Sequence, residues 1–140
     1  MNKSLITLAV NARAYLENHK DTLELPFISR FPTNSCEIAS LVLAYIFKDE
    51  YPDIDFFIVK AKKPSCGLHF WVEAEGNIFD LTADQLENIN SPIFGEPSAP
   101  QLHEYKIYEK SEIRAELKDH DWSDRLHALP EISQVVRGIA

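Results

Sequence analysis

The sequence predicts an α+β domain in which a central antiparallel β-sheet of three to four strands packs against one buried helix. Three observations support this fold class. Residues 35–47 form an almost wholly apolar helical stretch, residues 54–60 and 68–74 carry strand-type side chains, and helical periodicity returns at both ends of the chain. The 140 residues contain no repeat and no dividing linker, so we expect a single domain spanning 1–140.

The first half of the chain predicts two helices. Apolar residues recur at helical spacing between Ser4 and His19. Residues 21–34 contain two prolines and predict an irregular segment that leads into the second helix. Ser35 is expected to be the N-cap of that helix, which should lie at the centre of the domain and end before Tyr51-Pro52-Asp53.

The second half predicts a β-hairpin followed by shorter elements. Residues 68–74 and 77–81 should pair around a turn at Glu75-Gly76-Asn77. Thr82 with Gln85 fits a capping box for a short helix after the hairpin. The remaining expectations are a loop or lid over 90–101, a strand over 105–108, and helical segments over 111–138 that break at Trp122 and Pro130.

Composition and charge exclude several classes of protein. The chain is 45% hydrophobic and 26% charged, which is ordinary for a globular domain. Its formal net charge of −8 offers no basic stripe to replace phosphate counterions, so we expect neither nucleic-acid nor anionic-membrane binding. No apolar run reaches the roughly 18 residues of a membrane-spanning helix. The apolar run Leu5 to Val10 is also too short for a signal peptide.

The cysteine content predicts a reducing compartment. Two cysteines in the whole chain are not a disulfide framework, so we expect a cytoplasmic protein. A Cys36–Cys66 disulfide is the alternative that the sequence leaves open.

Three residues together offer nucleophilic chemistry. Cys36 stands where the apolar helix begins, and unpaired N–H groups at a helix N-terminus favour a thiolate. His69 stands at the entry of the first hairpin strand, and Asp80 stands on the returning strand. The hairpin should bring the histidine and the aspartate together beside the helix tip. Cys36, His69 and Asp80 are therefore a candidate nucleophile, general base and orienting carboxylate.

The motifs around these residues resemble a known superfamily. A cysteine at a helix start is followed by His-x-Trp-x-Glu from His69 and by Phe-Asp-Leu-Thr-Ala from Phe79. This order is similar to that of transglutaminase-like and papain-like cysteine enzymes, over about residues 30–86. The resemblance implies a papain-like or transglutaminase-like core, and it implies the triad roles given above. It also implies acyl transfer on amide bonds, by a hydrolase, deamidase or transglutaminase that needs no cofactor and accepts a peptide, protein or small amide.

Neighbouring residues complete or complicate this site. The backbone N–H of Cys36 is one candidate donor to an oxyanion, and the Asn34 amide is a second. Trp71 is a candidate wall of the active site, although core packing is the simpler interpretation. The loop over 90–101 is a candidate wall of the substrate cleft. Glu37 departs from the small or neutral residue that related enzymes often place after the cysteine.

Two alternatives compete with the enzymatic interpretation. Cys66 and His69 have the spacing of a metal-ligand pair that Cys36 or Asp80 could complete. Because structural zinc sites normally show two such pairs, we expect no metal. The second alternative is a catalytically inactive binding or regulatory module, such as an inhibitor or immunity protein, and the small size and acidity of the chain and Glu37 favour it.

Overall fold

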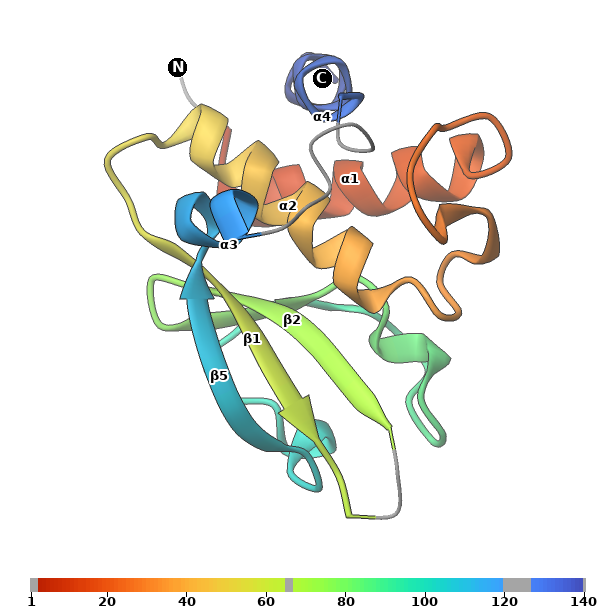
Figure 1. Cartoon of the computed structure of the whole chain (residues 1–140), viewed down its shortest axis with the longest axis vertical. Coiled ribbons are helices and arrows are strands. Elements are labelled where there is room, and N and C mark those ends of the chain that lie inside the picture. Colours follow the sequence, from red (N-terminus) through yellow and green to blue (C-terminus); the bar gives the residue numbers. More distant parts are fainter. Residues whose placement is uncertain (1–2, 65–66, 120–126, 140) are drawn as a thin grey trace.

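The α+β class is confirmed, but the sheet has five strands rather than the predicted three to four. The computed structural model describes residues 3–64, 67–119 and 127–139. Within them, one antiparallel sheet has the strand order β4-β3-β2-β1-β5 and carries helices on one face (Figure 1). The strands are β1 (Phe56–Lys62), β2 (Leu68–Ala74), β3 (Asn77–Asp80), β4 (Ile93–Glu96) and β5 (Lys106–Glu112). The α-helices are α1 (Leu5–His19), α2 (Cys36–Glu50), α3 (Ile113–Asp119) and α4 (Leu129–Arg137).

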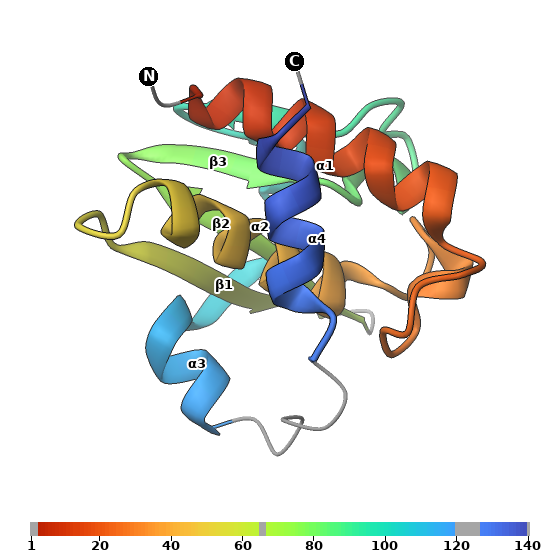
Figure 2. The ribbon, with the colours of Figure 1, turned by 90° about the horizontal axis from the view of Figure 1, so that it is seen from above.

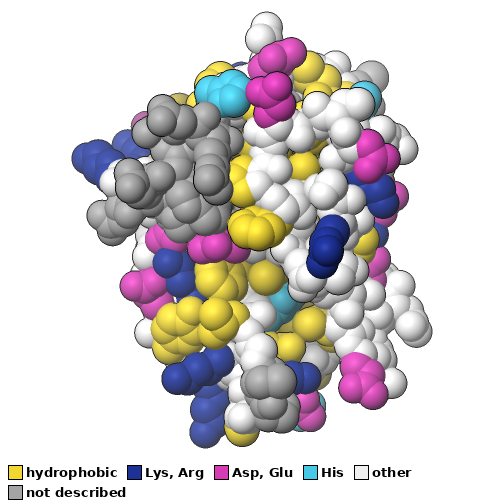
Figure 3. Space-filling view, turned by 45° about the vertical axis from the view of Figure 1, so that its right-hand side comes forward, with side chains coloured by type: hydrophobic (Ala, Val, Ile, Leu, Met, Phe, Trp, Pro, Cys, Tyr) yellow, Lys and Arg dark blue, Asp and Glu magenta, His cyan; other side chains and the backbone are white. Residues whose placement is uncertain are grey.

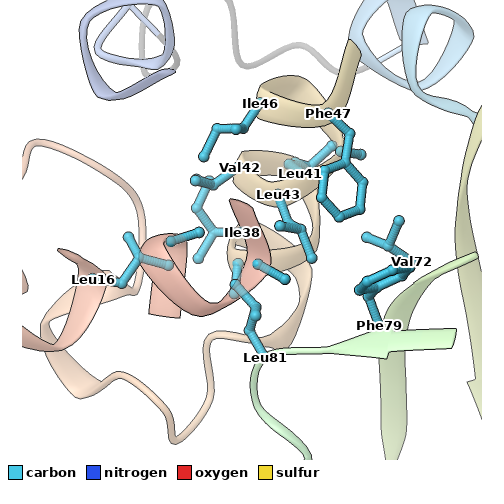
Figure 4. Close-up of a cluster of buried hydrophobic side chains, with 14 of the residues drawn as sticks. Leu16, Ile38, Leu41, Val42, Leu43, Ile46, Phe47, Val72, Phe79 and Leu81 are labelled. Atoms are coloured by element: carbon cyan, nitrogen blue, oxygen red, sulfur yellow. The ribbon is translucent and has the colours of Figure 1, made fainter. Parts of the chain in front are cut away.

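Helix α2 lies at the centre of the larger hydrophobic core. Four consecutive residues, Leu41 to Ala44, are wholly buried, so every side of this part of the helix is covered. The sheet covers one side through Val72 and Phe79, as Figure 4 shows, and α1 and α4 cover the others. Seen from above, α4 crosses α2 next to α1 (Figure 2). This enclosure fixes the N-terminus of α2, and with it Cys36, against the sheet.

A smaller hydrophobic cluster covers the opposite face of the sheet. It is built from Trp71 and short side chains of β1, together with residues of the irregular segment between β3 and β5. Its buried members are Val59, Ala61, Trp71, Ala83, Ile93 and Leu102. The side chains of one strand alternate between the two faces, so His69 and Trp71 belong to this side of β2 while Phe70 and Val72 face α2.

The strand that the sequence did not predict is β4, within the supposed loop over 90–101. Ile93 and Phe94 form a very short apolar run between Pro92 and Pro97, and prolines in that position suit an edge strand because they cannot donate ladder hydrogen bonds. Gly95 has φ 82°, and a Cβ there would lie 3.0 Å from the Phe79 ring. The fifth strand was not predicted because it is only four residues long and is flanked by residues typical of turns.

The hairpin is predicted well, with a tighter turn than expected. Ala74 pairs with Asn77, so only Glu75 and Gly76 form the turn, and both have positive φ angles of 51° and 75°. Two residues of this conformation match the twist of adjoining strands.

One helix boundary is confirmed and another is wrong. Helix α2 ends at Glu50, directly before Tyr51-Pro52-Asp53, as predicted. Pro130 does not break a helix, because it lies in the first turn of α4, where a missing N–H costs nothing. The break predicted at Trp122 lies outside the described residues. Among the described helices, none has the length and apolar character needed to cross a membrane.

Candidate active site

His69 and Asp80 form a buried pair at the start of the hairpin. The register that pairs Val72 with Phe79 places Asp80 opposite Trp71, on the face of the sheet that also carries His69. The distance from His69 Nε2 to Asp80 Oδ2 is 2.6 Å, and each side chain is only 1% exposed. The predicted contact between histidine and aspartate is present in the structure.

The second carboxylate oxygen of Asp80 is also held. The backbone N–H of Thr82 donates to Oδ1 over 3.1 Å, and the Thr82 hydroxyl lies 3.4 Å from the same atom. Because both oxygens have donors, the carboxylate cannot rotate away from His69 without losing hydrogen bonds. The predicted capping box is wrong: Thr82 makes no side-chain capping bond, and the helix after it is one 3₁₀ turn, Ala83–Gln85.

The surroundings of His69 favour its protonated form. Burial alone would lower the pKa of His69, but the charge and hydrogen bond of Asp80, followed by those of Cys36, raise it to about 9. The imidazole lies near the rings of Trp71 and Tyr105, at centroid distances of 5.8 Å and 5.5 Å. Since Nε2 is occupied by Asp80, Nδ1 is the ring nitrogen left for the thiol. At neutral pH, His69 is therefore an imidazolium between a carboxylate and a cysteine.

Cys36 is the first residue of α2, as predicted. It is a half-buried free thiol, and its backbone N–H stands at a position that has no acceptor within the helix. Ser35 occupies the N-cap position but makes no capping hydrogen bond, and its buried hydroxyl has no partner among the described residues. The position of the cap was predicted correctly and its hydrogen bond was not.

Of the two further predicted site residues, Asn34 lines the groove beside Cys36 and Trp71 is buried in the core. Asn34 has a left-handed backbone (φ 55°), and its N–H donates to Gln85 Oε1 over 3.0 Å. Its side chain is exposed and lines the same groove as Cys36, as the predicted role in oxyanion binding would require. Trp71 is 3% exposed and does not line that groove, so it is a core residue that packs behind His69 rather than a wall.

The groove beside Cys36 has a volume of about 730 Å³ and joins two segments distant in the sequence. Its apolar lining consists of Phe27, Ile38, Leu68 and Phe70. Its polar lining consists of Ser29, Arg30, Asn34 and Glu37. The side of the molecule turned forward in Figure 3 carries hydrophobic side chains across its middle. Residues 90–101 do not line this groove, so the prediction that they form a cleft wall is wrong for it. The segment that leads into α2 forms that wall instead.

Arg13 supports the site from α1, a role that no sequence pattern indicated. Its guanidinium forms two hydrogen bonds of 2.7 Å with Asp84, donates to the Leu81 carbonyl, and lies 4.9 Å from the centre of the Phe31 ring. It thereby links the segment after Asp80 to the segment before Cys36. Together with Gln85, whose Oε1 accepts from the Asn34 N–H, Arg13 helps to fix the distance between Cys36 and the hairpin.

The described part of the chain contains no cluster of metal-binding side chains. No group of three or more His, Cys, Asp or Glu side chains there could hold a metal ion. Cys66, one member of the predicted ligand pair, lies outside the described residues.

Comparisons with known proteins leave the family open. No protein-family model matches the chain, and searches of curated proteins and of solved structures found no match. The function is therefore inferred from the side chains of the site itself.

Proposed function

We propose that the protein is a cysteine-dependent acyl-transfer enzyme that acts on amide bonds, as a hydrolase, a deamidase or a transglutaminase. On this proposal, α2 and the sheet are the core of the transglutaminase-like and papain-like superfamily that the Cys–His–Asp order resembles. The observation that carries the proposal is the buried 2.6 Å pair of His69 and Asp80, whose imidazole also interacts with Cys36. A thiol, an imidazole and a carboxylate in series are the groups that this chemistry requires.

In the first half-reaction, the thiolate of Cys36 attacks the amide carbon. A carbon–sulfur bond forms, and the carbonyl oxygen takes the negative charge. The Cys36 backbone N–H and the Asn34 side-chain amide are the donors that we assign to that oxygen. The His69 imidazolium gives its proton to the leaving nitrogen as the carbon–nitrogen bond breaks, which leaves a thioester and a neutral imidazole.

In the second half-reaction, water or a second amine attacks the thioester. Neutral His69 takes a proton from the attacking molecule, and the carbon–sulfur bond breaks to return the thiolate. Asp80 fixes the imidazole orientation and stabilises its positive charge throughout. Water yields a carboxylic acid and an amine yields a new amide, and neither outcome requires a cofactor. The substrate is a peptide, a protein or a small amide.

p-Nitrophenyl acetate tests this chemistry without the natural substrate. We expect a burst of p-nitrophenolate, an acetyl group on Cys36 in the intact mass, and continued release as the thioester is hydrolysed. Cys36→Ala should lose all three while keeping its circular dichroism spectrum. His69→Ala should slow the release at least about 100-fold, the usual contribution of a general base. Full activity in Cys36→Ala would show that the assignment is wrong.

One observation favours the inactive binding module as a second candidate. His69 is 1% exposed and does not line the groove, so only Cys36 of the three residues is open to a ligand there. The rate of iodoacetamide reaction, measured from pH 5 to 10, separates the candidates. In an enzyme, Cys36 should be alkylated at neutral pH, and His69→Ala should suppress this alkylation. In a binding module, His69→Ala should leave the dependence of the alkylation rate on pH unchanged.

We also propose a reducing, cytoplasmic setting. The mechanism needs Cys36 as a thiol, and Cys36 is not in a disulfide.

A further inference from the structure

The groove beside Cys36 contains the two most exposed large hydrophobic side chains of the described residues. Phe27 is 64% exposed and Leu68 is 58% exposed, and both line the same groove. Phe27 belongs to the segment before α2, and Leu68 is the first residue of β2. Exposed apolar side chains that gather in one hollow mark a binding surface more often than scattered ones do.

The exposure of Phe27 is built into the backbone around it. Leu25 and Ile28, on either side, are buried, whereas Phe27 turns outward with φ 64°. A bulky residue adopts this left-handed conformation only where the surrounding structure holds it there. The phenyl ring is thus presented to the groove from a fixed position.

Charge adds a second requirement on the occupant. Arg30 lines the groove, and its exposed guanidinium has no carboxylate partner among residues 3–64, 67–119 and 127–139. Glu37 lines the same groove, so the attraction for a carboxylate comes from Arg30 itself and not from a net positive charge of the groove. A guanidinium binds a carboxylate with paired hydrogen bonds. The volume of about 730 Å³ lies within the range of ligand sites and is large enough for several peptide residues.

We propose that the acyl donor is a peptide segment with a large apolar side chain beside an acidic residue. The apolar side chain lies between Phe27 and Leu68, and the carboxylate pairs with Arg30, close to the Cys36 sulfur. Phe27, Leu68 and Arg30 are then specificity-determining residues. This inference rests on the proposed acyl-transfer function, and it selects peptides and proteins from the substrates named above while excluding small uncharged amides.

Peptidyl fluoromethyl ketones that alkylate Cys36 test the inference. Four tripeptide reagents combine Leu or Ser at one position with Glu or Gln at the next, and intact mass gives the rate constant of alkylation for each. Each rate is divided by the iodoacetamide rate of the same variant, so that intrinsic thiol reactivity cancels. The wild type should prefer Leu to Ser by about tenfold or more, which corresponds to burying one aliphatic side chain. It should also prefer Glu to Gln.

Single variants assign each preference to its residue. Phe27→Ser and Leu68→Ser should reduce the preference for Leu to within about threefold, and Arg30→Gln should remove the preference for Glu alone. Ile107→Ser is the matched control, because Ile107 is a similarly exposed apolar residue of β5 that does not line the groove. It should behave as the wild type does.

The outcomes separate this inference from the proposed function. Three results would each overturn the inference. They are equal rates for the four reagents, a preference for Leu that survives in Phe27→Ser and Leu68→Ser, and reaction with iodoacetamide but with none of the peptides. An iodoacetamide profile that does not depend on His69 would instead overturn the proposed function, whatever the side-chain preferences are.

Discussion

Two ion pairs hold the end of β3 and the segment that follows it, and they differ in what they can do. Asp80 pairs with His69, and Asp84, four residues later, pairs with Arg13 over 2.7 Å. The first pair is 1% exposed on both sides, and it includes a histidine whose pKa is raised from 6.5 to about 9. The second is 12% and 19% exposed, and its arginine stays charged at any pH near neutrality. Both anchor the chain, but only the first interacts with the Cys36 thiol.

Breaking the His69 pair should have the largest effect on stability. Asp80→Ala leaves a buried imidazolium without its carboxylate, so we expect the free energy of unfolding to fall by about 3–5 kcal/mol. Urea unfolding followed by circular dichroism measures this loss. A fall of less than about 1 kcal/mol would mean that the pair is not ionised in the folded protein.

The same pair should make stability depend on pH, with a defined sign. The pKa of His69 is raised from 6.5 to about 9 in the folded protein, so its stabilising contribution is complete below pH 6.5 and is lost as the pH rises through 9. Unfolding free energy should therefore decrease across this window by up to about 1.4 kcal/mol per pH unit. Urea midpoints measured between pH 6 and 9.5 check this.

Two variants separate the contributions of the two ion pairs to this pH dependence. Asp80→Asn should flatten the dependence on pH, whereas Asp84→Ala should retain it, because Arg13 does not titrate in this range. Equal dependence in both variants would assign the effect to other groups.

The Arg13 pair should contribute less. Asp84→Ala removes two hydrogen bonds to a partly exposed guanidinium that still has Glu17 and the Leu81 carbonyl as partners. We expect a loss of about 1–3 kcal/mol in unfolding free energy, smaller than that of Asp80→Ala in the same assay. A larger loss would reverse the order of the two pairs.

The smallest effect should come from Thr82. Thr82→Val removes a long 3.4 Å hydroxyl contact and keeps the backbone hydrogen bond to Asp80, so about 1 kcal/mol or less should be lost. If Thr82→Val flattened the pH dependence as strongly as Asp80→Asn does, the hydroxyl would be a main determinant of the charge on His69.

The sequence predicted the parts of this site that local patterns encode. The bounds of β2 follow from its strand-type residues, the start of α2 follows from the apolar run after Cys36, and the hairpin brings His69 and Asp80 to one face. These features depend on neighbours within about a dozen residues.

The supporting contacts could not be predicted in the same way. Arg13 meets Asp84 across 71 positions, and Gln85 meets Asn34 across 51. The local sequence around Arg13 or Gln85 does not indicate these distant partners, because they are brought together only by tertiary packing. The capping pattern at Gln85 favoured a local bond, and the distant one prevailed.

The most direct test of the account is the titration of the His69 imidazole by ¹⁵N NMR. The account predicts a midpoint near pH 9 in the wild type and a lower one in Asp80→Asn. A wild-type midpoint at or below 6.5 would show that His69 is neutral at physiological pH, and it would contradict an imidazolium held between Cys36 and Asp80.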